Sequence, residues 1–166
     1  MGNELNCSMF RAMDVLGDRW TLMVLREAFM GVRRFTEMQR DLGIARNVLT
    51  DRLNFLVETG VLERRQYQDR PVRHEYRLTD MGRELQPALL TLMHWGDTYL
   101  SPDGAPALME HTDCGHVTSP LLVCEHCREP LTTRNVRLTP GPSYCEGEDP
   151  AADRAAAREH DRATAA

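Results

Sequence analysis

The stretch that decides the fold is residues 36–60, TEMQRDLGIARNVLTDRLNFLVETG. Its apolar spacing predicts a helix over 36–42, capped by Thr36, and a second helix over 45–59. Gly43 between them permits a tight turn, because glycine adopts backbone conformations that other residues avoid. A helix, a glycine turn and a second helix in this order are typical of a helix-turn-helix.

The second helix has the features of a helix that enters the major groove of DNA. Its leucines recur at i, i+4 and i+7 and predict one face that packs on the protein. The other face is polar, and its first turn carries Arg46, Asn47 and Thr50. Arginine can pair with guanine, asparagine with adenine, and threonine with a base edge or a methyl group. We therefore expect these three side chains to contact base pairs.

A β-hairpin is predicted directly after this helix. Two extended runs, 61–67 and 74–78, flank a turn-rich stretch that contains Pro71. A hairpin in this place is the wing of a winged helix, so the expected fold is mainly α with a small β wing. Exposed arginines are more often solvated than bound, but the order of elements favours DNA contact for a set on the helices and the wing. This set is Arg33, Arg34, Arg40, Arg52, Arg70 and Arg73.

Three further helices are predicted around this unit. Two precede it, over 8–16 and 20–30, and a long one follows the wing from residue 79 to residue 100. Pro87 predicts a kink or a break in the long helix. The apolar side chains of the long helix exceed what one helix needs to pack on a small domain, which favours a homodimer over a purely internal core. They are Leu85, Leu89, Leu92, Trp95 and Tyr99.

The distribution of charge agrees with DNA binding, although the formal net charge is −5. All 20 basic residues are arginine. Residues 101–166 contain 6 arginines and 11 acidic residues, whereas residues 33–77 contain 10 arginines and 7 acidic residues. A local basic patch determines how a protein meets a polyanion, so the acidic C-terminal third does not argue against DNA as the partner.

Other classes of protein lack support in the sequence. No apolar run approaches the roughly 18–20 residues of a membrane helix, and the N-terminus has no secretory signal pattern. We therefore expect a cytoplasmic protein with no membrane partner. The sequence contains no P-loop, nucleophile elbow or H-E-x-x-H motif, so no enzymatic activity is expected.

Residues 7–100 resemble the HxlR family of bacterial winged-helix regulators, which is related to the MarR-like group. The resemblance rests on many short motifs in the same order: CSM (7–9), VLGDRWTL (15–22), LREAF (25–29), LGI (42–44), LTDRL (49–53) and YRLTDMG (76–82). It implies transcriptional control by a homodimer on a palindromic operator, joined through the first helix and the helix after the wing, with no catalytic site. Many relatives have serine where Ala45 stands, so the usual helix cap is missing here.

A Cys/His segment over 107–140, after a linker at 101–106, resembles an incomplete zinc ribbon. Its ligand pairs, H-x-x-C followed by C-x-x-C, have the spacing of two knuckles that close one tetrahedral zinc site of the Cys₃His type. The predicted ligands are His111, Cys114, Cys124 and Cys127. Cys145 and His116 are alternatives for the fourth position, and the cysteines could also be reduced thiols or a redox pair. A structural zinc leaves open a second function, a protein-interaction adaptor that carries a winged helix.

Two regions remain. Residues 141–166 are predicted to form a flexible tail, because they include an Ala-, Arg- and acid-rich stretch with no aromatic residue after position 145. Cys7 lies just before the first helix, where Ser8 could be the cap and the helix N-terminus would stabilise a thiolate. The family resemblance implies that Cys7 could sense oxidants or electrophiles; the alternative is a small buried apolar residue.

Overall fold

The computed structural model describes residues 6–147 and 149–164. The chain divides into a larger unit, residues 15–120, and a smaller unit that combines residues 6–14 with the described residues from 121 onward. The predicted linker at 101–106 lies inside the larger unit, so these units differ from the predicted domains.

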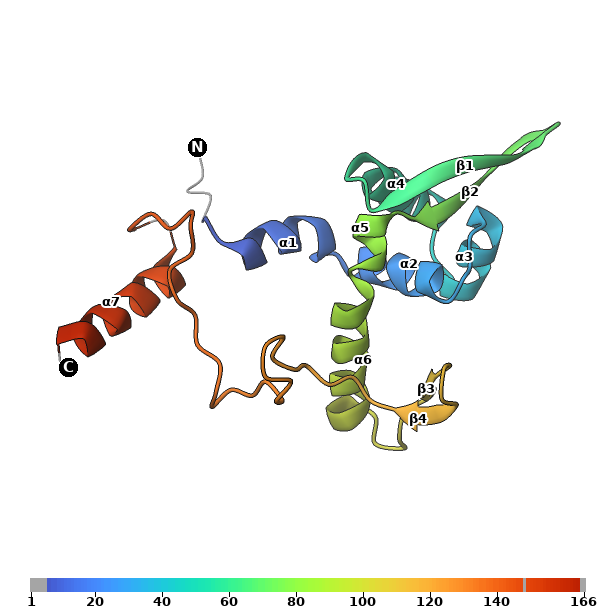
Figure 1. The fold of residues 1–166 in the computed structure, drawn as a ribbon. Helices are drawn as coiled ribbons and strands as arrows, with labels where there is room; N and C mark the ends of the chain where they lie inside the picture. Colours follow the sequence, from blue (N-terminus) through green and yellow to red (C-terminus); the bar gives the residue numbers. More distant parts are fainter. Residues whose placement is uncertain (1–5, 148, 165–166) are drawn as a thin grey trace. The chain divides into compact units, whose positions relative to one another are not determined.

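The larger unit is a winged helix, as predicted (Figure 1). Helix α1 (Ser8–Leu16) spans the boundary between the units. The remaining elements follow in the order α2 (Arg19–Phe29), α3 (Phe35–Leu42), α4 (Arg46–Glu58), β1 (Leu62–Asp69), β2 (Val72–Leu78), α5 (Asp80–Arg83), α6 (Gln86–Leu100), β3 (Met109–His111) and β4 (His116–Thr118).

The core lies where α2 packs against α3, α4, β2 and α6. The predicted apolar face of α4 is confirmed, because Leu49, Leu53 and Leu56 are fully buried. Burial of each leucine stabilises the fold by roughly 1.5–3 kcal/mol relative to an exposed side chain. The other core residues are Val24, Leu25, Met38, Ile44, Val61, Leu62 and Leu89.

The starts of the helices differ in part from the prediction. Helix α3 begins at Phe35 with Arg34 as its N-cap and no side-chain cap bond, so Thr36 lies inside the helix and its predicted capping role is wrong. Helix α4 also lacks a side-chain cap at Ala45, as expected. The turn between the two helices uses Gly43 at a φ of 59°, the left-handed conformation that glycine adopts without strain.

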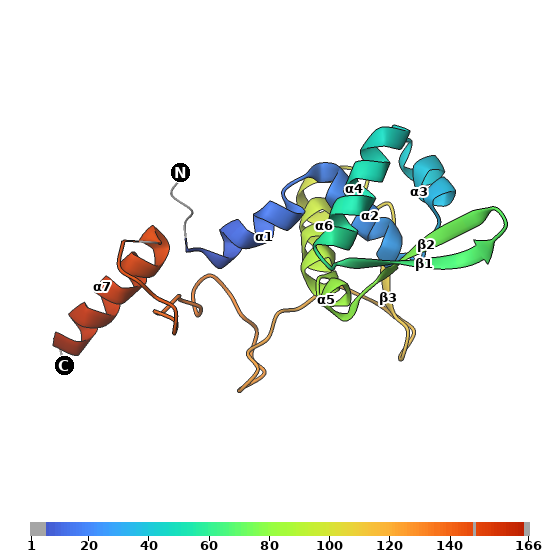
Figure 2. The same ribbon diagram turned by 90° about the horizontal axis from the view of Figure 1, so that it is seen from above.

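The wing is longer than predicted, because its strands continue almost to the turn. Strands β1 and β2 pair antiparallel from Leu62↔Leu78 to Asp69↔Val72, with a register shift at Tyr67. Only residues 70 and 71 remain between the strands. The end of the hairpin therefore extends beyond the helices of its unit (Figure 2).

The predicted break in the long helix is confirmed. Thr79 caps the short helix α5 by accepting the Gly82 N–H at 3.1 Å, and Pro87 lies in the first turn of α6, where a missing N–H costs nothing. A Cβ at Gly82 would lie 2.3 Å from the Val61 carbonyl oxygen, so only glycine allows α5 to approach the start of the wing.

The smaller unit contains a helix that the sequence analysis did not predict. Helix α7 (Pro150–Thr164) lies where we expected a flexible tail. Its alanines favour a helix, and Asp149 caps it by accepting the Ala151 N–H at 2.8 Å. Across the described residues of both units, no helix is long and apolar enough to span a membrane.

Candidate nucleic-acid interface

The exposed face of α4 carries the three predicted base-reading residues. Arg46, Asn47 and Thr50 are all exposed in the first turns of the helix. The Arg46 guanidinium lies 5.2 Å from the centre of the Phe35 ring, a cation–π contact that orients it, while the Thr50 hydroxyl donates to the Arg46 carbonyl at 2.8 Å. The Arg46 donors and the Asn47 amide thus remain open to a partner in solvent.

Arg52 lies on a different side of α4 from these residues. Its side chain is 32% exposed and reaches Asp18 before α2, with an Nη1–Oδ1 distance of 3.7 Å. Its Nε is buried without a hydrogen-bond partner in the part of the chain that the structure describes. The structure therefore places Arg52 beside Asp18 and does not bring it together with the predicted base-reading residues.

Asp18 is a residue whose role the sequence analysis missed. Its Oδ1 accepts the N–H groups of Trp20 at 2.9 Å and Thr21 at 3.1 Å, which makes it the N-cap of α2. The sequence could have indicated this role, because an aspartate directly before a stretch with helical apolar spacing is typical of a helix N-cap.

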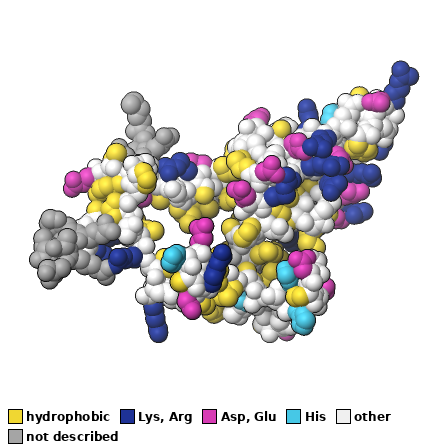
Figure 3. Space-filling view, in the orientation of Figure 1, with side chains coloured by type: hydrophobic (Ala, Val, Ile, Leu, Met, Phe, Trp, Pro, Cys, Tyr) yellow, Lys and Arg dark blue, Asp and Glu magenta, His cyan; other side chains and the backbone are white. Residues whose placement is uncertain are grey.

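The two wing arginines and the arginines around α3 are exposed at the surface of the larger unit. Arg70 and Arg73 flank the hairpin turn. Arg34 stacks on Tyr67 of the wing at 4.9 Å, and Arg40 donates to Asp41 at 2.7 Å, a bond that raises the pKa of the guanidinium. Figure 3 shows basic side chains gathered over the hairpin and the helices beside it. This surface matches the basic stretch of the sequence.

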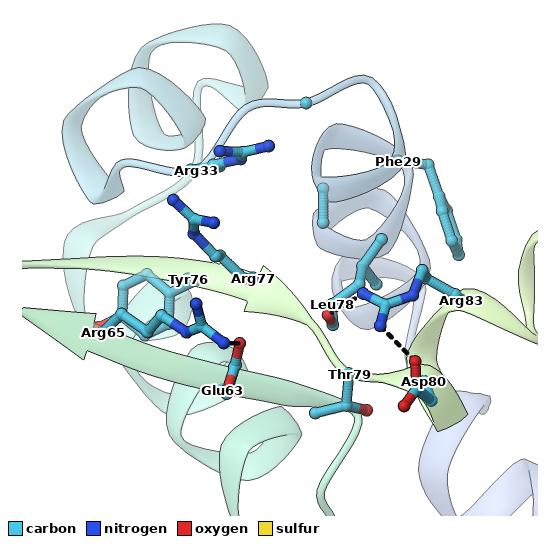
Figure 4. Close-up of a pocket in the computed structure, with 12 residues that line it drawn as sticks. Phe29, Arg33, Glu63, Arg65, Tyr76, Arg77, Leu78, Thr79, Asp80 and Arg83 are labelled. Atoms are coloured by element: carbon cyan, nitrogen blue, oxygen red, sulfur yellow. Dashed lines mark hydrogen bonds and ion pairs between the residues drawn. The ribbon is translucent and has the colours of Figure 1, made fainter.

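Arg33 contributes to a basic hollow of about 500 Å³ between the end of α2, the wing strands and α5 (Figure 4). The other three arginines of the hollow are held by carboxylates: Arg65 by Glu63 at 2.7 Å, Arg77 by Glu75 at 2.6 Å, and Arg83 by Asp80. Arg33 has no ion pair within the described chain. The sequence analysis did not single out Arg65, Arg77 or Arg83, because their position depends on the packing of β2 against α2.

Helix α6 presents an apolar face to solvent. Only Leu89 is buried, whereas Leu92, Trp95 and Tyr99 are 52%, 53% and 71% exposed. The rings of Trp95 and Tyr99 lie 5.8 Å apart. An apolar strip of this size on one helix is more than the larger unit uses for its own core.

The H-x-x-C pair lies in the turn between β3 and β4. His111 Nδ1 and Cys114 Sγ are 3.3 Å apart, and the His111 carbonyl accepts the N–H groups of Cys114 and Gly115. Gly115 has a φ of 68°. The two potential ligand atoms of this turn therefore point to the same place.

The C-x-x-C pair has the same turn geometry within the smaller unit. The residue after its second cysteine, Arg128, has a φ of 62°, rare for a residue with a Cβ. The Cys124 thiol has a lowered pKa because it is hydrogen-bonded. The largest contribution comes from the Cys127 N–H, followed by the His126 N–H and the Cys127 side chain. Within the described ranges, no three His, Cys, Asp or Glu side chains gather to hold a metal ion. The four-ligand zinc site thus stays a prediction, as do the alternatives His116 and Cys145.

Cys7 is half-buried and free. Ser8 is the first residue of α1, and its hydroxyl accepts from the Arg11 guanidinium at 3.1 Å, so it is not the predicted cap. The Cys7 carbonyl accepts the Arg11 N–H at 3.1 Å, which places the thiol at the start of the helix. Its sensing role stays a prediction.

A helix-turn-helix with an open polar helix and an arginine-bearing wing defines a transcriptional regulator of the winged helix-turn-helix class. The comparison with protein families agrees: the HxlR-like helix-turn-helix model matches residues 15–104. The chain belongs to this family, as the sequence motifs indicated.

Relatives and solved structures extend this result. An uncharacterised HTH-type transcriptional regulator of Mycobacterium tuberculosis, Rv3095, is 51% identical over 138 residues, which cover 82% of this chain and 87% of the relative. The crystal structure of PA1607, a candidate transcription factor, is 37% identical with a TM-score of 0.73 and covers 80% of this chain and 94% of that protein. Both matches are longer than residues 15–104, so the similarity includes chain outside the family region.

A third similar protein is a redox regulator. HypR in its reduced form is 30% identical with a TM-score of 0.54, over 57% of this chain and 95% of that one. The relatives are thus transcriptional regulators, a class without enzymatic activity.

Proposed function

We propose that the protein is a sequence-specific DNA-binding regulator that acts as a homodimer on a palindromic operator. One observation carries this proposal: α4 buries its leucines completely and leaves Arg46, Asn47 and Thr50 open at its N-terminal end. In helix-turn-helix proteins that end of the recognition helix contacts base edges. The arginines of the wing and α3 would contact phosphates and fix the register on the duplex.

Selection of bound fragments from a random DNA pool tests this function. We expect an enriched inverted repeat whose half-sites are about 10 base pairs apart, the spacing for one turn of DNA. A gel shift should then give at least about 10³-fold higher affinity for the selected duplex than for a scrambled one. Recovery of no common sequence, or equal affinity for both duplexes, would contradict the proposal.

Dimerisation is supported by the exposed apolar face of α6. A dimer that covers this strip removes two aromatic side chains per chain from water, and each of them can bury about 150–250 Å². A twofold symmetric pair would present two copies of α4, which matches a palindromic site.

Thiol control of DNA binding is the second part of the proposal. HypR, which is described as a redox regulator in reduced and oxidised forms, supports it by similarity. Cys7 at the start of α1 is our candidate thiol. Gel shifts with the selected operator before and after treatment with an alkyl hydroperoxide test this part; an unchanged affinity in wild type would exclude it.

We also propose a structural zinc ion bound by His111, Cys114, Cys124 and Cys127. The support comes from the two turns, in which the two ligands are three residues apart. In both turns the residue directly after the second ligand, Gly115 or Arg128, has a positive φ. Positive φ at that point lets backbone N–H groups turn back toward the first ligand, as they do at Cys124. Zinc would stabilise a segment that has little core of its own.

Metal analysis of protein purified without a histidine tag tests the zinc proposal. We expect about one zinc per chain in the wild type and its loss in Cys124→Ser, with Cys7→Ser as the control that retains the metal. Protein that folds with no zinc would contradict it. If zinc is present but no DNA is selected, the adaptor function becomes the better interpretation.

A further inference from the structure

The smaller unit contains a cavity of about 390 Å³ that two cysteines line from distant parts of the sequence. Cys7 contributes from the start of α1, and Cys145 from the segment before α7. Both thiols are free, Cys7 half-buried and Cys145 exposed. Neither cysteine belongs to the two turns that we assign to zinc.

The chain segments that carry these cysteines are hydrogen-bonded to each other. The Asn6 side-chain amide donates to the Ser143 carbonyl at 3.0 Å, which joins the neighbour of Cys7 to a residue two positions before Cys145. Ser143 and Tyr144 also line the cavity. The two thiols are therefore held on adjoining segments, although 137 residues separate them in the chain.

A carboxylate lies in the same cavity. Asp149 accepts the Ala151 N–H at 2.8 Å as the cap of α7, and it also accepts a hydrogen bond from the Cys7 thiol. The hydrogen bond from the Ala151 N–H, and to a smaller extent the bond from the Cys7 thiol, lower the pKa of the Asp149 carboxyl. The Asp149 carboxylate is ionised at neutral pH, and its hydrogen bond from the Cys7 thiol places it where it can pass the Cys7 proton on to a departing group.

We propose that Cys7 and Cys145 form an intrachain disulfide when the protein reacts with an organic hydroperoxide, and that Asp149 relays the Cys7 proton to the departing alkoxide. This inference rests on the proposed thiol response and names its second thiol. Cys145, like Cys7, lies outside the family region of residues 15–104.

The chemistry balances in two steps. The Cys7 sulfur attacks the distal peroxide oxygen, an S–O bond forms, and the O–O bond breaks. As it breaks, Asp149 passes the Cys7 thiol proton to the departing alkoxide, which leaves as the alcohol. The Cys145 sulfur then attacks the Cys7 sulfenic acid, the S–S bond forms, and the S–O bond breaks to release water. Two thiols are oxidised by two electrons, and one hydroperoxide is reduced to one alcohol and one water.

The test uses the whole chain as purified and one equivalent of tert-butyl hydroperoxide. We expect two thiols per chain to disappear, a Cys7–Cys145 peptide pair in non-reducing mass mapping, and migration as a single chain on a non-reducing gel. Dithiothreitol should restore both thiols. A Cys7–Cys7 bond between chains, or a partner of Cys7 other than Cys145, would overturn the proposal.

Three variants make the test specific. In Cys145→Ser we expect Cys7 to stop at the sulfenic acid, which dimedone traps, whereas the control Thr98→Ala in α6 should still form the Cys7–Cys145 bond. Asp149→Asn keeps the cap, since asparagine caps as well as aspartate, and should slow the loss of the Cys7 thiol about tenfold or more. An unchanged rate would remove Asp149 as the proton relay.

The result of the cross-linking test can be distinguished from a failure of the proposed DNA-binding function. DNA binding of the reduced protein does not require Cys145, so a failed cross-link with intact operator binding rejects only this inference. Loss of operator binding by the reduced wild type would reject the proposed function and leave the disulfide chemistry unaffected.

Discussion

The charged side chains of the larger unit fall into two groups: those that contact other parts of the protein, and those that are exposed without an ion pair in the described chain. Asp18 caps α2, and Arg52 of α4 is directed to it by a weak ion pair. Arg46 and Arg73 are exposed and have no ion pair among the described residues. The same residue type, arginine, thus contacts the protein at one position of α4 and is available to DNA at another.

Asp18→Ala is expected to destabilise the fold by about 1–2 kcal/mol, mainly because the N–H groups of Trp20 and Thr21 lose their acceptor. The bridge to Arg52 adds little, since its 3.7 Å contact is partly exposed. Urea unfolding of wild type and variant measures the difference. Asp18→Asn is the matched control: it keeps the cap and loses only the ion pair, so a loss as large as that of the alanine variant would contradict the capping role.

Arg46→Ala should weaken binding to the selected operator by about 1–3 kcal/mol and leave binding to scrambled DNA almost unchanged. Its guanidinium lies at the end of α4 that faces base edges in this class of protein. Arg73→Ala in the wing should weaken both alike, because a phosphate contact carries no sequence information. Titration of both duplexes at one salt concentration compares the variants; equal losses for Arg46→Ala on both duplexes would remove its base-reading role.

At the scale of elements, the apolar periodicity of the sequence predicted which helix faces are buried. It did not predict helix starts that depend on a single hydrogen bond or on a turn. The leucines of α4 predicted its buried face, because their residue type and spacing favour burial of one face. The proline of α6 predicted the break before this helix, because proline has no backbone N–H. The start of α3 was misplaced by one residue, since no side chain caps it and the turn geometry fixes it instead. Helix α7 was missed because its alanines indicate a helix only once Asp149 is recognised as its cap.

The exposed face of α6 gives a prediction about assembly. The double variant Trp95→Ala, Tyr99→Ala should shift the protein from dimer to monomer, because the two rings supply most of the exposed aromatic area of the helix. Sedimentation equilibrium at several concentrations measures the shift. Thr98→Ala is the control on the same helix, since its hydroxyl only donates to the His94 carbonyl. Wild-type protein that sediments as a monomer would exclude dimerisation through α6.

At the scale of the molecule, the exposed side chains of α4 could be predicted from the sequence, whereas the surroundings of Cys7 could not. Arg46, Asn47 and Thr50 were predictable because a helix of known register fixes which side chains are exposed. The pairing of Cys145 with Cys7 in one cavity was not, because it depends on contacts between residues 6–11 and 138–152, which no local pattern encodes.

The charge distribution gives the last prediction, which concerns how DNA affinity depends on salt. Residues 33–77 carry a formal charge of +3 within a chain of −5, so phosphate binding should come from this region alone. Removal of one phosphate-binding arginine should reduce the slope of log K against log salt by about 0.9. Arg33→Gln with Arg70→Gln should therefore flatten the slope on scrambled DNA by about 1.8, twice the value for one phosphate. Arg137→Gln with Arg154→Gln, an equal change of net charge in the smaller unit, should leave the slope unaltered. Equal flattening by both pairs would mean that total charge, and not a local surface, governs the encounter with DNA.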